Sequence, residues 1–296
     1  MFKKTLALLL ALAISVGAAI GATALRNDKN DKKENVVQNQ GSYTLNLQSG
    51  PTFPARQVTP LTFDIRTRNN NILKDFDIVH EKRMHLIIVR KDRSNFQHTH
   101  PVFDENSGVF ELSPFIFPTE GEYRIFADFT PSSAQKGTDG TKLPVTIYQD
   151  VRVGAMDRYK PQLLGKDRLK SISNGFETGF FISADDDSSD TVGDTFYSGQ
   201  SSVIVIYIDK NGQPYNNLQT YLGALGHMVV LGPKLEFIHA HPVNQDINNQ
   251  QGLIGFEINF PDPGQYKVYL QTKANNRVST FDYNLTVLAG SADQNG

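Results

Sequence analysis

The chain has 296 residues and a net charge of -2 at pH 7, a balance without the basic footprint of a nucleic-acid-binding protein. The absence of cysteine excludes disulfides, a lipoprotein anchor and thiolate metal ligands, so a metal would have to be held by His, Met, carboxylate or backbone oxygen. The length predicts about two domains.

Residues 1–24 have the pattern of a signal peptide or membrane anchor. Lys3 and Lys4 precede an almost wholly apolar stretch from Thr5 to Ala22, and small residues at 22 and 24 suit cleavage by a signal peptidase. The stretch is also long enough to remain in the bilayer uncleaved, which would be the chain's only membrane contact. In both cases the lysines stay inside, which predicts an extracytoplasmic protein that is secreted, periplasmic or held at the outer face of the cytoplasmic membrane.

Residues 25–41 are almost entirely polar and predict a disordered linker, and residues 291–296 predict a disordered tail. Between them, short runs rich in β-branched and aromatic residues are separated by Gly, Pro, Asn and Asp, which is typical of an all-β fold. The runs are 43–47, 61–67, 84–89, 123–129, 145–153, 203–208, 266–271 and 281–287.

An internal repeat groups these strands into two tandem immunoglobulin-like β-sandwich domains, expected at 42–155 and 156–290. The first copy contains HLIIV at 85–89, FQHTHP at 96–101 and FPTEGEY at 117–123. The second contains HMVVL at 227–231, FIHAHP at 237–242 and FPDPGQY at 260–266. A strand that runs into turn residues comes before these blocks in both copies, and each copy has the size of one such sandwich.

All seven histidines belong to these copies: His80, His85, His98 and His100 in the first, and His227, His239 and His241 in the second. A hairpin that pairs Val89 with Phe96 places Ile87 opposite His98, and His85 opposite His100. Pairing Leu231 with Phe237 likewise places Val229 opposite His239, and His227 opposite His241, although the second loop is one residue shorter. Directly opposed residues share a face of the sheet. Each copy therefore predicts a triangle of three imidazoles on one face of a hairpin.

Three imidazoles in a triangle predict a metal site, and a donor set of neutral nitrogens suits Cu(II), Zn(II) or Ni(II). Because Ile87, Val89 and Phe96 lie on the histidine face of the hairpin, we expect that face to be the core side, with the triangle at the open end of the sandwich. His80, Met84 and Met228 are possible additional ligands, although each Met points away from its neighbouring His and core packing favours it.

Other functions have weaker support in the sequence. The acidic residues at 185–187, 190 and 194 lack the glycine and terminal Glu of an EF-hand loop, which favours a solvated loop over a calcium site. The common hydrolase, nucleotide and metalloprotease motifs are absent. The leading prediction is a non-enzymatic metal-binding protein. The alternatives are a structural or adhesive module whose histidines only order the hairpin and, with less support, a zinc hydrolase.

The segments 81–101 and 221–242 resemble the YtkA-like and FixH-like immunoglobulin-type domains of secreted bacterial proteins, which are often found with copper-handling or respiratory components. The resemblance implies a β-sandwich outside the membrane and makes copper the first metal to test, with zinc second. The chain lacks the Met-rich motif of periplasmic copper chaperones. The predicted role is copper sequestration, or transfer of copper to a protein partner, with one three-histidine site per module.

Overall fold

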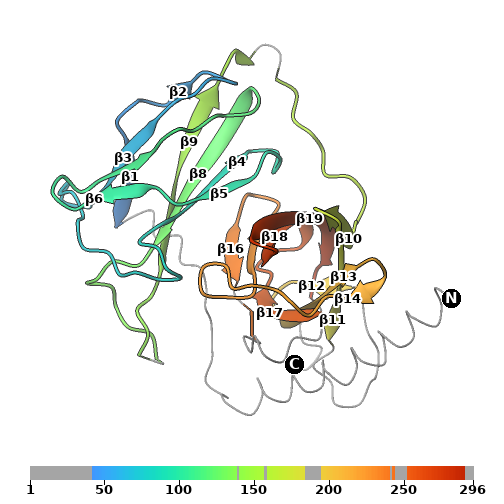
Figure 1. Cartoon of the computed structure of the whole chain (residues 1–296). Helices are drawn as coiled ribbons and strands as arrows, with labels where there is room; N and C mark the ends of the chain where they lie inside the picture. The colour runs from blue at the N-terminus through green and yellow to red at the C-terminus, as the bar shows by residue number, and fades with distance from the viewer. Residues whose placement is uncertain are drawn as a thin grey trace, which may run out of the picture. The chain divides into compact units, whose positions relative to one another are not determined.

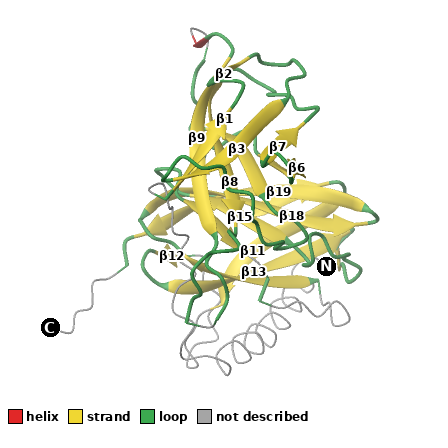
Figure 2. Ribbon diagram, turned by 90° about the vertical axis from the view of Figure 1, so that its left-hand side faces the viewer, coloured by secondary structure: helices red, strands yellow, loops and turns green. Residues whose placement is uncertain are grey.

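The computed structural model describes residues 42–138, 140–156, 159–183, 195–240, 242–243 and 252–290. The predicted signal or anchor, linker and tail lie outside these ranges. The described chain divides into two compact units, one ending at Leu163 and the next beginning at Leu164. Strands and their connecting loops make up both units (Figure 2), and the described ranges contain a short 3₁₀ turn at Met156 but no α-helix. Within those same ranges no helix is long and apolar enough to cross a membrane.

The first unit is a sandwich of two sheets (Figure 1). One sheet has the order β1-β3-β7-β6, with β1 at Tyr43–Leu47, β3 at Leu61–Thr67, β7 at Val109–Leu112 and β6 at Val102–Asp104. The other has the order β2-β9-β8-β4-β5, with β2 at Thr52–Phe53, β9 at Val145–Val153, β8 at Gly121–Phe129, β4 at His85–Arg90 and β5 at Gln97–Thr99. β2 runs parallel to β9, and the other neighbours in this sheet are antiparallel.

The second unit repeats this plan. One sheet has the order β12-β19-β18-β15-β16, with β12 at Phe196–Tyr197, β19 at Arg277–Leu288, β18 at Gly264–Ala274, β15 at His227–Leu231 and β16 at Phe237–Ala240. The other has the order β10-β11-β13-β14, with β10 at Lys170–Ser173, β11 at Phe176–Ser183, β13 at Ser201–Lys210, β14 at Gln213–Pro214 and β17, at Leu253–Asn259, also paired with β13. β12 is parallel to β19, as β2 is to β9. The predicted all-β fold with two repeated sandwich domains is confirmed.

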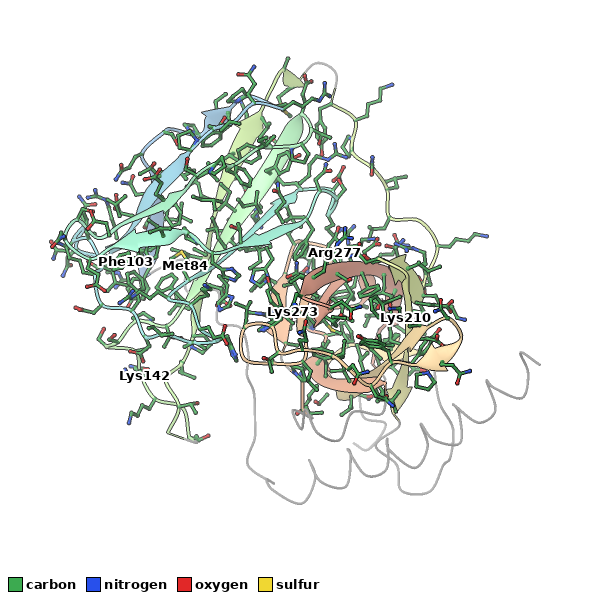
Figure 3. All side chains as sticks on the ribbon, in the orientation of Figure 1. Met84, Phe103, Lys142, Lys210, Lys273 and Arg277 are labelled. Carbon is green, nitrogen blue, oxygen red and sulfur yellow. The ribbon has the colours of Figure 1, made fainter. Side chains whose placement is uncertain are left out.

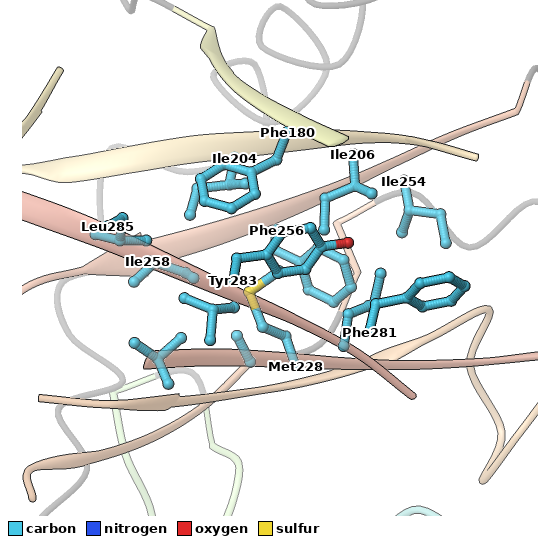
Figure 4. Close-up of a cluster of buried hydrophobic side chains, with 14 of the residues drawn as sticks. Phe180, Ile204, Ile206, Met228, Ile254, Phe256, Ile258, Phe281, Tyr283 and Leu285 are labelled. Atoms are coloured by element: carbon cyan, nitrogen blue, oxygen red, sulfur yellow. The ribbon is translucent and has the colours of Figure 1, made fainter. Parts of the chain in front are cut away.

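Aromatic and branched side chains fill the space between the two sheets of each unit. In the first unit Phe110 stacks on Phe63 at 5.4 Å between ring centroids and meets Phe76 edge-on at 5.1 Å. In the second unit Phe256, Phe281 and Met228 belong to one buried cluster (Figure 4). Without tryptophan, phenylalanine and tyrosine supply the large side chains of both cores.

The repeated Phe-Pro-x-x-Gly-x-Tyr block makes the same corner in both units. The Tyr123 hydroxyl donates to the Thr119 carbonyl oxygen at 3.0 Å, and the Tyr266 hydroxyl donates to the Asp262 carbonyl at 2.7 Å. Burial raises the pKa of Tyr266 to about 12, so the hydroxyl remains a donor at neutral pH. The glycine at the matched position has φ of 138° in the first unit and 140° in the second, a conformation that favours glycine. This block thus fixes where β8 and β18 begin.

Candidate metal centre

Three histidines of the first unit, His85, His98 and His100, meet at one point. Each offers one ring nitrogen, and these three nitrogens all lie within 4.8 Å of one another. His85 Nδ1 is 3.1 Å from His98 Nε2 and 3.3 Å from His100 Nε2. Among the described residues, this is the group of His, Asp and Glu side chains with the spacing of a metal site.

The register of the β4–β5 hairpin produces this convergence. The ladder pairs Ile87 with His98 and ends at Leu86 and Thr99. The next position in the same register opposes His85 to His100, whose imidazoles are in contact. Opposed residues and residues two apart along a strand share a face of the sheet, so the three rings point the same way. The predicted pairing of Ile87 with His98 is confirmed.

The prediction that the histidines lie on the core side is wrong. The core between the two sheets contains Leu86 and Ile88, which alternate with His85 and Ile87 along β4. Successive side chains of a strand point to opposite faces, so the histidines lie on the outer face of their sheet, at the start of β4. The error arose because β4 is apolar on both faces and therefore shows no alternation in sequence.

A backbone carbonyl fixes the tautomer of His85. Its Nε2 lies 3.2 Å from the carbonyl oxygen of Val79. A carbonyl oxygen only accepts hydrogen bonds, so a neutral His85 donates through Nε2 and keeps its lone pair on Nδ1. Nδ1 is the atom that faces the other two imidazoles. This is how metal-binding histidines are usually oriented by their outer contacts.

The turn before β4 holds that carbonyl in place. Val79 and Lys82 exchange two backbone hydrogen bonds, at 2.9 and 3.1 Å, around two residues with positive φ. The first of these is His80, whose ring centroid is 6.2 Å from that of His85. Burial lowers the pKa of His80, with the charge of Asp128 acting the other way. His80 is a neighbour of the three-histidine group and is outside it.

The nitrogen spacing fits one ion. Ligands at about 2.0–2.1 Å from a tetrahedral metal lie about 3.3 Å from each other. Two of the three separations, 3.1 and 3.3 Å from His85 Nδ1, agree with this value, and all three nitrogens lie within 4.8 Å of one another. His85 is buried and the other two rings are half-buried, so a bound ion would be partly shielded from water. The donor set supplies no negative charge and leaves at least one coordination position open.

The second unit repeats the beginning of this arrangement. Val229 pairs with His239, as predicted, and His227 Nδ1 is 3.5 Å from His239 Nε2. His227 Nε2 is 2.9 Å from the Tyr221 carbonyl oxygen, six residues upstream, as Val79 is for His85. The third predicted ligand, His241, lies outside the described residues.

The two methionines lie away from the histidines. Met84 belongs to the core of the first sandwich (Figure 3), and Met228 belongs to the core of the second (Figure 4). Each precedes or follows a histidine directly and so points to the opposite face of its strand. The acidic residues at 185–187, 190 and 194 lie outside the described residues.

The structure adds one residue that the sequence did not indicate. Asp128 of β8 is the cross-strand partner of His85 and is buried. Thr146 donates a hydrogen bond to its carboxylate at 3.1 Å. Burial raises the pKa of Asp128, while attraction from His85 and this hydrogen bond act in the opposite direction. No motif marks this aspartate, since only the pairing of β4 with β8 brings it to the site.

No curated protein sequence matches the chain. Solved structures that resemble it are β-sandwich proteins at low identity. The soluble domain of PmoD from Methylocystis sp. shares 12% identity over 41% of this chain and 97% of that chain, with a TM-score of 0.28. The fibronectin(III)-like modules of Clostridium thermocellum CbhA share 10% identity over 86% and 98% of the two chains, with a TM-score of 0.22. The D00-D0 domain of Intimin shares 11% identity over 83% and 99%, with a TM-score of 0.20.

A family model matches the chain twice, at residues 36–142 and 183–289, and so covers more than half of it. The two matches fall on the two halves that carry the repeated blocks. The chain therefore belongs to the family described as domain of unknown function DUF8832, and it carries that domain in tandem.

Proposed function

We propose that this protein binds metal ions outside the cytoplasm without catalysing a reaction, and that its role is to sequester copper or pass it to a protein partner. One observation carries the proposal: three imidazole nitrogens lie within 4.8 Å of one another, and the first of them has its lone pair directed at the other two. Zinc is the second candidate metal, since three neutral nitrogens suit both ions.

The choice of copper and of an exported location comes from the sequence. The hairpin motif resembles that of YtkA-like and FixH-like domains, and the first 24 residues have the composition of an export signal. Outside the cytoplasm copper is met mainly as Cu(II), for which imidazole is a good ligand. The open coordination position suits a carrier, because a partner's ligand can enter there before the ion leaves.

The test is a metal titration of the purified chain without an affinity tag. We expect Cu(II) to bind close to two ions per chain, with His98→Ala/His100→Ala lowering this to one. Adding His239→Ala/His241→Ala should remove the second. Each ion bound at a three-imidazole site should also give an electron paramagnetic resonance spectrum with nitrogen hyperfine splitting.

The matched control replaces two half-buried glutamines of the same sheet that are not part of the three-histidine group. Gln97→Ala and Gln149→Ala alter the same sheet and should leave the number of bound ions unchanged. If the wild type and the histidine variants bind Cu(II) and Zn(II) equally weakly, the proposal fails. The imidazoles would then act only as hydrogen-bonding groups that order the hairpin, as the contacts of His85 would permit.

A further inference from the structure

The two units place different residues beside their first histidine. In the first unit the cross-strand partner of His85 is Asp128, and in the second the partner of His227 is Gln271. Both partners are buried, and both hydrogen-bond to a threonine on the next strand, at 3.1 Å in each case. The two positions are matched in register, in burial and in their threonine partner, but one side chain is an ionisable carboxyl and the other is a neutral amide.

That difference matters because the three imidazoles are neutral. A divalent ion among them leaves two uncompensated positive charges in a partly buried site, which is costly in a medium of low dielectric constant. The Cβ atoms of directly opposed residues lie about 4.5–5.5 Å apart, so the ionised carboxylate of a residue opposite His85 is near enough to offset one of those charges. An amide at the same position offsets none.

We propose that Asp128 makes the first-unit site selective for divalent over monovalent ions. This inference rests on the proposed metal-binding function. Asp128 acts as a charge behind His85 and outside the group of ligating nitrogens. The attraction between a carboxylate and an ion is proportional to the ion's charge. Losing the carboxylate therefore lowers the affinity for a divalent ion by a larger factor than the affinity for a monovalent ion.

The test compares Zn(II) and Ag(I), two ions that do not change oxidation state during a titration. Both are measured by chelator competition on the whole chain carrying His239→Ala/His241→Ala, so that only the first site binds. The variant is Asp128→Asn, which keeps the volume and an oxygen for Thr146. We expect the Zn(II) affinity to fall about 10–100-fold, the range for outer contacts of metal ligands, and the Ag(I) affinity about 3–10-fold.

The matched control is Asp150→Asn. Asp150 is on β9, on the same face, four residues beyond Thr146, and its ion pairs are with Arg124 and Lys91. Asp150 lies about 13 Å beyond Thr146 along β9, so the loss of its charge should change the Zn(II) and Ag(I) affinities by less than about twofold.

The outcomes separate the two proposals. If the parent chain binds neither ion, the metal-binding function and this inference both fail. If the parent chain binds both ions and Asp128→Asn weakens them by the same factor, Asp128 has only a structural role and this inference alone is overturned. Asp128→Gln, which copies the second unit, must give the same ratio of effects as Asp128→Asn, because both remove the charge.

Discussion

The two units have the same sandwich, the same hairpin register and the same carbonyl behind the first histidine, and they differ in the residues around it. His80 and Asp128 of the first unit correspond to Leu222 and Gln271 of the second. The framework that orients the imidazoles is thus common to both units, and the electrostatic environment is particular to one. The fold supplies the geometry of the imidazoles, and the neighbouring side chains set the polarity and charge around them.

The largest expected effect tests whether the two frameworks are equivalent. Phe110 of β7 and Phe256 of β17 are fully buried at matched positions of their sandwiches. Phe110→Ala and Phe256→Ala should each lower the free energy of unfolding of their own unit by about 3–5 kcal/mol, because each leaves a cavity in a packed core. Hydrogen exchange measured at β8 and β18 reports each unit separately.

Val102 provides a control for the core variants, because its side chain is 76% exposed on β6. Val102→Ala should change the free energy of unfolding by less than about 0.5 kcal/mol. A cost below about 1 kcal/mol for Phe256→Ala, with the full cost for Phe110→Ala, would show that the second core is packed differently from the first.

Much of this framework could be predicted from residue patterns, and the limits have physical causes. The pairing of Ile87 with His98 follows from loop length and hairpin geometry, both of which are local. The face of the sheet on which the histidines lie could not be predicted in this way, because β4 is apolar on both faces. The position of Asp128 beside His85 could not be predicted either, since it depends on the pairing of two strands that are distant in sequence. Local patterns thus identify the histidines that converge more readily than the charged residues that surround them.

A medium effect on the free energy of unfolding is expected from the loss of a buried ion pair that the first unit has and the second lacks. Arg90 and Asp92 are buried and form an ion pair at 2.8 Å. In the second unit Gly232 occupies the position of Arg90. Although burial acts to raise it, hydrogen bonds from Arg90, Gln162 and Ser94 hold the pKa of Asp92 below its ordinary value. A lowered folded pKa gives stability above the unfolded pKa of about 3.9, and this stability is lost as the pH falls through the folded value.

Asp92→Asn should therefore lower the free energy of unfolding of the first unit by about 2–3 kcal/mol at pH 7. The difference from the wild type should narrow below about pH 4, where Asp92 of the unfolded wild-type chain takes up a proton, and it should keep narrowing until the folded carboxyl is protonated at lower pH. Urea unfolding at several pH values measures both quantities. Glu236→Gln, in the corresponding turn of the second unit, is the control and should cost less than about 1 kcal/mol. A difference that stays constant from pH 7 to pH 3 would mean that the charge of Asp92 is unimportant.

The smallest effect separates charge from geometry at the site itself. Thr146→Val removes the hydrogen bond to Asp128, and Thr280→Val removes the one from Gln271. In metal-free protein each should cost about 1 kcal/mol of unfolding free energy. A bound cation favours the ionised form of Asp128, and hydrogen bonds to charged groups are worth about 1.5–3 kcal/mol. With saturating Zn(II), the cost of Thr146→Val should therefore rise to about 2 kcal/mol, while the cost of Thr280→Val should stay near about 1 kcal/mol. Hydrogen exchange at β8 and β18 measures the two costs separately. Equal costs in the two units with and without Zn(II) would mean that the carboxylate does not respond to the ion, and the contrast between the two sites would then be one of shape alone.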